Sequence, residues 1–432
     1  MSSTVSTQPA PEQRTAVRQS DAASASERIG SLDVLRGIAL LGMFLVHFYD
    51  FATDPGGARG VTAVYRRIVT LFFEERFWTM FGILFGVGFA VQLRRAEARG
   101  GPFVRNYLRR LLALAGFGFI AHAVLGFNVL LGYAAWALPL LLVRKWPMKA
   151  LVLALVISAA SGSIFYFARA VYRVNAVGET TYLAEIKDIG MRAKAFRQAN
   201  EQAQNAPDYA SVFSARLAHM KWFYAQPFSF LPVNTFTMFL LGVIGLRLGL
   251  FDRPEHHRRL IVALMIFGAA SWAAENWLFS DGPPPPPGAL LRSMLLEQIK
   301  HGYGQVRAMW LSFTYMGIVL LLVAHNRAWL RRLGAFGWTG RMALTLYMLQ
   351  IAVLDLTFSP YALHVQLTTL QGLAAGILLF LVNAAFARWW LRRFRFGPLE
   401  WLWRSITYGH LQAWRLESVG AYGSSTESPS RT

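Results

Sequence analysis

Long apolar stretches alternate with polar gaps along most of this 432-residue chain. One helix needs about 20 mostly apolar residues to cross the hydrocarbon core of a membrane, and a helix satisfies its own backbone groups in lipid. By this criterion the pattern predicts membrane-spanning helices over residues 32–51, 72–93, 111–125, 129–143, 150–172, 228–251, 260–279, 308–324, 342–358 and 370–389. We therefore expect an all-α fold, a polytopic membrane protein with a bundle of about ten transmembrane helices.

Arginine and lysine residues occur mainly in every second gap between these stretches. Clusters such as Arg94–Arg95, Arg258–Arg259 and Arg392–Arg393 follow the second, sixth and tenth stretches. Because cytoplasmic loops carry an excess of Lys and Arg, the pattern predicts cytoplasmic N- and C-termini. The net charge of +20 is then explained by topology and by contact with membrane lipids, and no basic-aromatic module indicates a nucleic-acid partner.

Polar segments flank and interrupt the predicted bundle. Residues 1–27 lack an apolar core and predict a disordered cytoplasmic tail rather than a signal peptide, and residues 411–432 predict a C-terminal tail. The transmembrane domain then covers residues 28–410, with extracytoplasmic loops at 173–221 and 280–307. These loops are either spacers between helices or caps over a cavity that opens outward. The absence of cysteine excludes disulfides and thiolate chemistry.

Ionisable residues near or within apolar stretches are candidates for a functional site, because they are costly in a membrane. Asp33 and Arg36 are three residues apart and share a helix face. They either form an interfacial ion pair or bind the phosphate groups of a donor. His47 lies about 16 Å further along the helix, where it is a candidate general base or a hydrogen-bonded interfacial histidine.

Three more residues are expected at one of two depths in the predicted bundle, that of Arg36 near the cytoplasmic end or that of His47 about 16 Å further along. Glu75 is a candidate partner of His47, or an acid in the solvated first turn of a helix. His122 lies at a depth similar to that of His47, as a second catalytic candidate or as an interhelical hydrogen-bonding group. Arg341 lies near the cytoplasmic side, where it binds a donor or extends to the membrane interface. No set of residues has the spacing of a metal site.

Four segments resemble the motifs of a known family. They are residues 28–42 with Asp33 and Arg36, residues 77–89, residues 340–350 ending at Gln350, and residues 396–409 with Glu400. These segments are similar to the YeiB-like family of bacterial membrane proteins, which carries the domain of unknown function 418. The resemblance spans about residues 28–410, and it implies a location in the bacterial inner (plasma) membrane with multiple passes.

That family looks distantly similar to transmembrane acyltransferases, including the lysosomal heparan glucosaminide acetyltransferase. The similarity implies transfer of an acyl group from a cytoplasmic acyl-CoA to an extracytoplasmic or lipid-linked glycan. Acyl-CoA would be a donor substrate, and no bound cofactor is expected. The implied catalytic residues are His47, Glu75 and His122, and the implied donor-binding residues are Asp33, Arg36 and Arg341.

Two other functions use the same buried polar residues. The first alternative is a transporter or channel for a small solute or lipid, and the second is a membrane scaffold without catalysis. Dependence on acyl-CoA separates the enzyme from both, and solute flux identifies the transporter. The acyl group, the acceptor and the oligomeric state are left open by the sequence.

Overall fold

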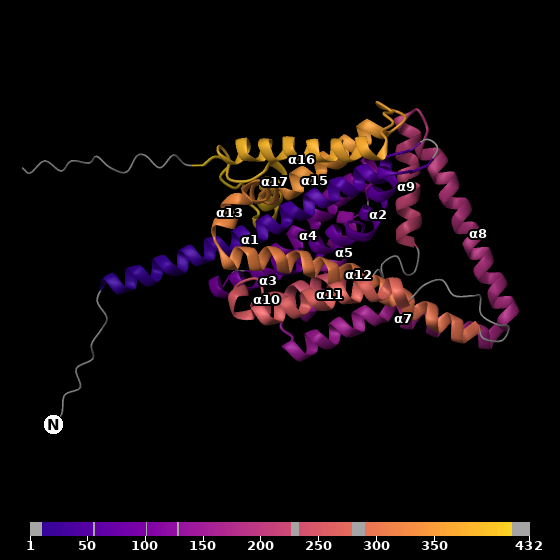
Figure 1. Ribbon diagram of the computed structural model, residues 1–432, viewed down its shortest axis with the longest axis horizontal. Coiled ribbons are helices and arrows are strands. Elements are labelled where there is room, and N and C mark those ends of the chain that lie inside the picture. The colour runs from indigo at the N-terminus through magenta and orange to yellow at the C-terminus, as the bar shows by residue number, and fades with distance from the viewer. Residues whose placement is uncertain are drawn as a thin grey trace, which may run out of the picture.

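The computed structural model describes residues 11–54, 57–100, 102–127, 129–225, 233–278 and 290–416. Within these ranges the chain is almost entirely helical, and the β-structure is limited to an isolated bridge between Phe394 and Arg415. The prediction of an all-α fold is confirmed. Figure 1 shows most of the helices running along the long axis of the molecule as a bundle.

The helices follow one another with short connections. In chain order they are α1 (Pro11–Phe51), α2 (Val61–Phe72), α3 (Arg76–Arg99), α4 (Phe103–Phe119), the π-helical turn η1 (Ile120–Val124), α5 (Val129–Ala137), α6 (Leu140–Val143), α7 (Met148–Val177), α8 (Glu179–Gln204), α9 (Tyr209–Ala225), α10 (Val233–Arg247), the 3-10 turn η2 (Pro254–His257), α11 (Arg258–Leu278), α12 (Leu290–His325), α13 (Ala328–Arg332), α14 (Gly334–Arg341), α15 (Ala343–Phe358), α16 (Thr369–Leu391) and α17 (Pro398–Tyr408).

The apolar helices have the dimensions expected of a membrane protein. In the described part of the chain, 5 helices are long and apolar enough to cross a membrane, or up to 6 if α14 and α15, bent by 84°, form one span. Shorter apolar segments lie at Val129–Val143, Thr235–Arg247 and Leu311–His325. A helix therefore lies within every predicted stretch, while the number that crosses the bilayer stays a prediction.

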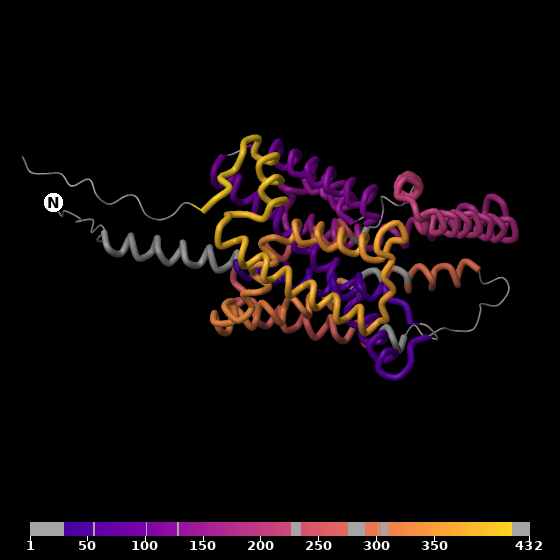
Figure 2. Tube along the Cα trace, turned by 90° about the horizontal axis from the view of Figure 1, so that it is seen from above, coloured from indigo at the N-terminus to yellow at the C-terminus, as the bar shows by residue number. Residues whose placement is uncertain are grey.

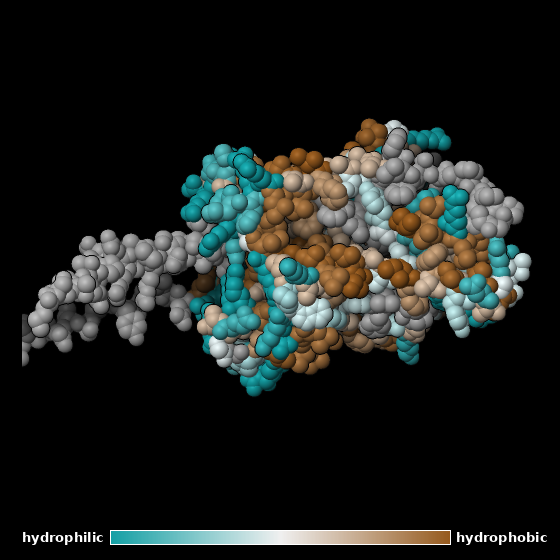
Figure 3. All heavy atoms as spheres, turned by 90° about the horizontal axis from the view of Figure 1, so that it is seen from below, coloured by the Kyte–Doolittle hydropathy of each residue, from teal (hydrophilic) through white to brown (hydrophobic). Residues whose placement is uncertain are grey.

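The two ends of the bundle differ in polarity. Figure 3 shows a band of apolar side chains around the middle of the molecule and hydrophilic side chains gathered at one end. We call this the arginine-rich end; there Arg94 pairs with Asp252, and Arg247 donates hydrogen bonds to the carbonyl oxygens of Arg144 and Trp146. At the opposite end α8 and α9 project beyond the bundle, and we call these two helices the arm (Figures 1 and 2).

Several segments that the sequence predicted as tails or loops are helical. Residues 11–27 belong to α1, since no Gly or Pro interrupts residues 12–29 and a helix propagates easily from an apolar segment that is already helical. Residues 173–221 form the end of α7, all of α8 and most of α9, and residues 290–307 form the first half of α12. Residues 1–10, 279–289 and 417–432, including the proline run, lie outside the described residues.

Glycines allow α3 and α10 to cross closely. A Cβ atom added at Gly86 of α3 would lie 2.0 Å from the carbonyl oxygen of Phe239 in α10. Reciprocally, a Cβ atom at Gly242 of α10 would lie 2.0 Å from the carbonyl oxygen of Ile83 in α3. Small residues at such crossings allow close van der Waals packing in lipid, where little hydrophobic force drives helices together.

Glycines also allow α1 and α14 to pack closely. A Cβ atom at Gly37 would lie 2.0 Å from the carbonyl oxygen of Phe336, and one at Gly340 would lie 1.8 Å from that of Asp33. Both glycines belong to the segments that resemble family motifs. Their role in the structure is to bring the bent α14–α15 pair against α1, and so to place Arg341 near Asp33 of that helix.

Replacing Gly86 with alanine is expected to destabilise the protein, because the new methyl group meets backbone that cannot move aside. We expect a cost of about 1–3 kcal/mol, seen as a lower melting temperature in detergent. Gly116→Ala is the matched control, since its added Cβ atom meets nothing within 4 Å. A melting temperature of Gly86→Ala equal to that of Gly116→Ala would contradict the α3–α10 crossing.

Candidate functional site

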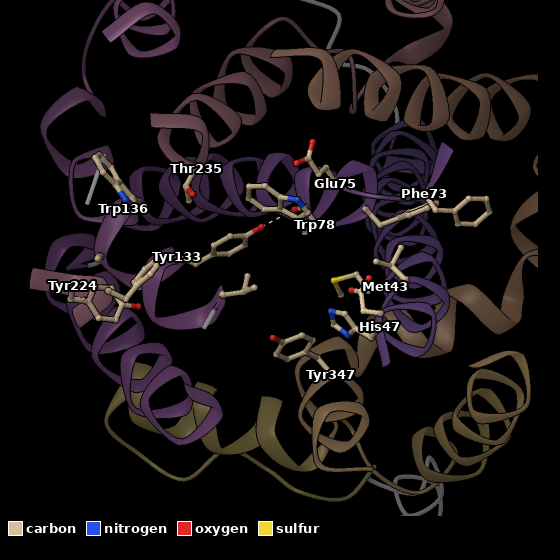
Figure 4. Close-up of a pocket in the computed structure, with 17 residues that line it drawn as sticks. Met43, His47, Phe73, Glu75, Trp78, Tyr133, Trp136, Tyr224, Thr235 and Tyr347 are labelled. Carbon is tan, nitrogen blue, oxygen red and sulfur yellow. Dashed lines mark hydrogen bonds between the residues drawn. The ribbon is translucent and has the colours of Figure 1, made fainter. Parts of the chain in front are cut away.

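A cavity of about 370 Å³ lies between the arm and the middle of the bundle, enclosed by α1, α3, α5, α9, α10 and α15 (Figure 4). Nearly half of its lining is aromatic, and its ionisable groups other than tyrosine are one imidazole and two carboxylates. The cavity is lined by Met43, Val46, His47, Asp50, Phe73, Glu75, Phe77, Trp78, Val129, Gly132, Tyr133, Ala135, Trp136, Phe223, Tyr224, Thr235 and Tyr347.

His47 is the imidazole of this lining. Its Nδ1 atom lies 3.2 Å from Nε2 of Gln350, which is fully buried in α15. The Oε1 atom of Gln350 has no hydrogen-bond partner within the described ranges. A half-turn of the Gln350 amide exchanges its oxygen and nitrogen. Oε1 then accepts a hydrogen bond from Nδ1–H of His47, which leaves the lone pair of Nε2 free to take a proton.

The face of α1 that carries His47 runs back to the arginine-rich end. Arg36 and His47 are eleven residues apart, which is close to three full turns of a helix. Met43 lies between them on this face and lines the cavity beside His47. Asp33 and Arg36 pair with an N–O distance of 2.8 Å, as their spacing indicates. One side of α1 thus carries the guanidinium group of Arg36 near the arginine-rich end and the imidazole of His47 at the cavity.

Glu75 and Asp50 supply the carboxylates of the cavity. Glu75 precedes α3 in a left-handed conformation with φ of 64°, which is costly for a residue with a side chain. Its carboxylate lies 3.7 Å from the guanidinium of Arg76. The structure places Glu75 and His47 in one cavity, but the hydrogen bond of His47 is to Gln350 rather than to Glu75, its candidate partner from the sequence.

His122 lies outside this cavity. It occupies the π-helical turn η1, and its Nε2 atom is 3.3 Å from Nδ1 of His219 in α9. Burial lowers the pKa of His219, because an apolar environment favours the neutral imidazole. His122 approaches the cavity only through Tyr224, whose ring centroid is 6.1 Å away. The structure therefore does not bring His122 into the cavity with His47, because η1 directs its side chain toward α9.

Two tyrosines also line the cavity, Tyr133 and Tyr347. The hydroxyl of Tyr133 donates to the carbonyl oxygen of Trp78 at 2.7 Å. The hydroxyl of Tyr347 is buried without a hydrogen-bond partner among the residues that the structure describes. Tyr347 precedes Gln350 by three residues on α15 and lies beside His47 in Figure 4. That three-residue spacing was the signal available in the sequence.

Glu400 has a structural place at the arginine-rich end. Its Oε1 atom accepts hydrogen bonds from the backbone N–H groups of Leu344 and Thr345, at 2.7 and 3.0 Å, and its Oε2 atom accepts one from the hydroxyl of Thr345 at 2.6 Å. Burial raises the pKa of Glu400, and the hydrogen bonds from Thr345 oppose that shift. Glu400 therefore caps the first turn of α15, the helix that carries Tyr347 and Gln350.

Comparison with known proteins identifies relatives over nearly the whole chain. An "Uncharacterized 39.9 kDa protein in amylase 3'region" of Bacillus acidopullulyticus is 30% identical over 389 residues, which cover 90% of this chain and 96% of the relative. "Uncharacterized protein YxaH" of Bacillus subtilis (strain 168) is 29% identical over 407 residues, covering 89% and 95%. "Uncharacterized protein YeiB" of Escherichia coli (strain K12) is 44% identical over 73 residues, which are 17% of this chain and 19% of YeiB. Residues 246–410 match the family "Protein of unknown function (DUF418)".

This chain belongs to the YeiB-like family. A second family match connects it to chemistry, since residues 28–184 match "Heparan-alpha-glucosaminide N-acetyltransferase, catalytic". That match includes His47 and most of the cavity wall. No solved structure is significantly similar to this chain. The YeiB-like protein is therefore a membrane protein with a domain similar to that of transmembrane acetyltransferases.

Proposed function

We propose that this protein is a multi-pass enzyme of the bacterial inner membrane. It transfers an acyl group from a cytoplasmic acyl-CoA to an extracytoplasmic or lipid-linked glycan. The proposal is carried by one observation: His47, hydrogen-bonded to the buried Gln350, lines an aromatic cavity and belongs to the segment that matches an acetyltransferase catalytic domain. The arginine-rich end is then the cytoplasmic side, and the arm lies outside.

The chemistry balances with the residues of the cavity. The acceptor amine or hydroxyl attacks the carbonyl carbon of the thioester, a C–N or C–O bond forms, and the C–S bond breaks. His47 takes the proton that the acceptor loses and returns it to the departing thiolate. The free hydroxyl of Tyr347 is available to donate a hydrogen bond to the carbonyl oxygen as negative charge develops there.

The lining of the cavity suits a sugar that carries an amine or hydroxyl groups. Rings such as those of Trp78, Trp136 and Tyr224 offer flat apolar surfaces for the faces of a pyranose. Asp50 and Glu75 are acidic, and no Lys or Arg is among the described residues of the lining. This charge balance favours a cationic or neutral acceptor over one that presents sulfate or phosphate to the cavity.

Proteoliposomes with the arginine-rich end outward provide the test. We expect label from external [¹⁴C]acetyl-CoA to appear on an amino sugar enclosed in the vesicle, and a comparison with its N-acetylated analogue separates transfer to the amine from transfer to a hydroxyl group. Transfer that is absent with every acyl-CoA and acceptor would contradict the proposal. Flux of the sugar without covalent modification would establish the transporter instead.

A further inference from the structure

Four arginines from separate helices converge at the arginine-rich end. Arg36 is in α1, Arg110 in α4, Arg341 at the end of α14 and Arg404 in α17, and we call them the arginine cluster. Asp33 pairs with Arg36 and interacts electrostatically with Arg341 and Arg404. Arg110 interacts with both Arg36 and Arg404. Helix contacts place the four arginines together: Arg110 packs on Trp403, the neighbour of Arg404, and Gly340, the neighbour of Arg341, packs against Asp33.

The carboxylates near the cluster do not neutralise it. Asp33 is shared among three of the arginines. Glu400 uses both of its oxygens to cap α15, so it is not available as a bidentate partner for a guanidinium group. Positive charge therefore exceeds negative charge at this site, and its innermost group, the guanidinium of Arg110, is only partly accessible to water. Such an excess is unfavourable unless an anion completes it.

Arg110 forms the floor of the site. Its guanidinium carbon lies 3.7 Å from the ring centroid of Trp403, whose indole N–H donates a 2.8 Å hydrogen bond to the backbone oxygen of Arg110. One face of the guanidinium group is thus held on an aromatic plane. Its Nε atom is shielded from solvent and has no hydrogen-bond partner in the described parts of the chain. The group is fixed in place while its hydrogen-bonding capacity is not used up.

The rim of the site is open. Arg341 and Arg404 are exposed, and the side chain of Arg36 retains 30% of its accessible surface. An anion can therefore enter from the aqueous side, be met by Arg341 and Arg404, and settle on Arg36 and Arg110. Planar guanidinium groups that approach from several directions match the oxygens of phosphate groups better than those of a single carboxylate.

We propose that the arginine cluster binds a molecule that carries two or more phosphate groups. A soluble diphosphate such as the nucleotide end of coenzyme A and a diphosphate lipid headgroup share this chemistry. Assigning the site to the acyl donor rests on the proposed function. Binding of phosphates to the cluster does not, because it requires no turnover at His47.

Calorimetry on the purified protein tests the site with coenzyme A, 3′,5′-ADP and inorganic phosphate as probes. We expect Arg110→Gln and Arg404→Gln each to weaken coenzyme A binding by about 10- to 100-fold, the usual effect of losing a charged hydrogen bond. Arg404 is exposed, so its replacement spares the fold. Arg259→Gln, an exposed arginine of α11 at the same end, is the matched control and should bind as wild type. His47→Ala should also retain binding, which separates this site from the transfer reaction.

A second arm of the experiment identifies the source of the phosphates. The same variants are melted in nanodiscs of phosphatidylcholine with and without cardiolipin. Stabilisation of wild type by cardiolipin that is lost in Arg404→Gln, without binding of soluble probes, supports the site and assigns it to a lipid headgroup. If neither the soluble probes nor cardiolipin distinguishes Arg110→Gln and Arg404→Gln from Arg259→Gln, the proposal is overturned.

Discussion

Replacing His47 with alanine is expected to reduce acyl transfer by about 10²- to 10⁴-fold, the usual contribution of a positioned acid–base group. The protein should fold as before, because His47 lines a cavity and its side chain is only partly enclosed, by neighbours such as Phe127 and Gln350. Initial rates of [¹⁴C]acetyl transfer in proteoliposomes measure the effect. Binding of coenzyme A should change little, since the arginine cluster lies at the other level of α1.

His122→Ala is the comparison that makes this result specific. Both histidines stand in predicted membrane-spanning stretches, but His122 contacts His219 and does not line the cavity. Its replacement should leave most of the activity. Gln350→Ala should keep the transfer reaction but shift its pH profile, because Nδ1 of His47 loses its hydrogen-bond partner. Equal losses in His47→Ala and His122→Ala would remove His47 from the role of base.

Local spacing explains what could be predicted of this site. The three-residue spacing of Asp33 and Arg36 predicted their ion pair, and the distance along α1 placed His47 at a separate level. Both features depend on one helix only. The partner of His47 could not be found in this way, because Gln350 is 303 positions away and reaches it only through the bend between α14 and α15.

The motif residues illustrate the same limit. Gly37 and Gly340 allow α1 and α14 to cross, and Glu400 caps α15, so these residues position other groups. From the sequence they looked like part of a functional signature. Arg110 and Arg404 looked like ordinary cytoplasmic charges, since a linear pattern does not show that Arg110 packs on Trp403 and interacts with Arg404.

The arm is attached by an ion pair that the sequence analysis did not identify. Arg216 of α9 binds Asp355 of α15, and both side chains are almost fully buried, at 6% and 5% exposure. Asp355 also accepts hydrogen bonds from Ser359, at 2.7 Å, and from Tyr361. Asp355 stands in a predicted membrane-spanning stretch, and its charge there was the signal available in the sequence. Its partner lay in a polar segment interpreted as a loop.

Replacing Arg216 with alanine is expected to release the arm from the bundle. The change leaves the Asp355 carboxylate buried without its cation, which typically costs about 3–5 kcal/mol. Phe223 and Tyr224 lie on the same helix as Arg216 and close the cavity, so acceptor binding should weaken together with stability. Hydrogen exchange of residues 209–225 measures the release directly, and the KM for the acceptor measures its consequence.

Two further variants test whether the unpaired, buried charge of Asp355 is what releases the arm in Arg216→Ala. Arg173 and Glu185 form an ion pair between α7 and α8, with exposures of 35% and 37%, and Arg173→Ala should cost about 1 kcal/mol or less. The double replacement Arg216→Met with Asp355→Leu removes both charges, and should recover much of the stability that Arg216→Ala loses.

If Arg216→Ala exchanged no faster than Arg173→Ala over residues 209–225, the ion pair would not be what holds the arm. If the double variant recovers its stability but not the acceptor KM, the ion pair also sets the position of α9. Apolar contacts alone then hold the helix against the bundle without aligning its aromatic side chains at the cavity.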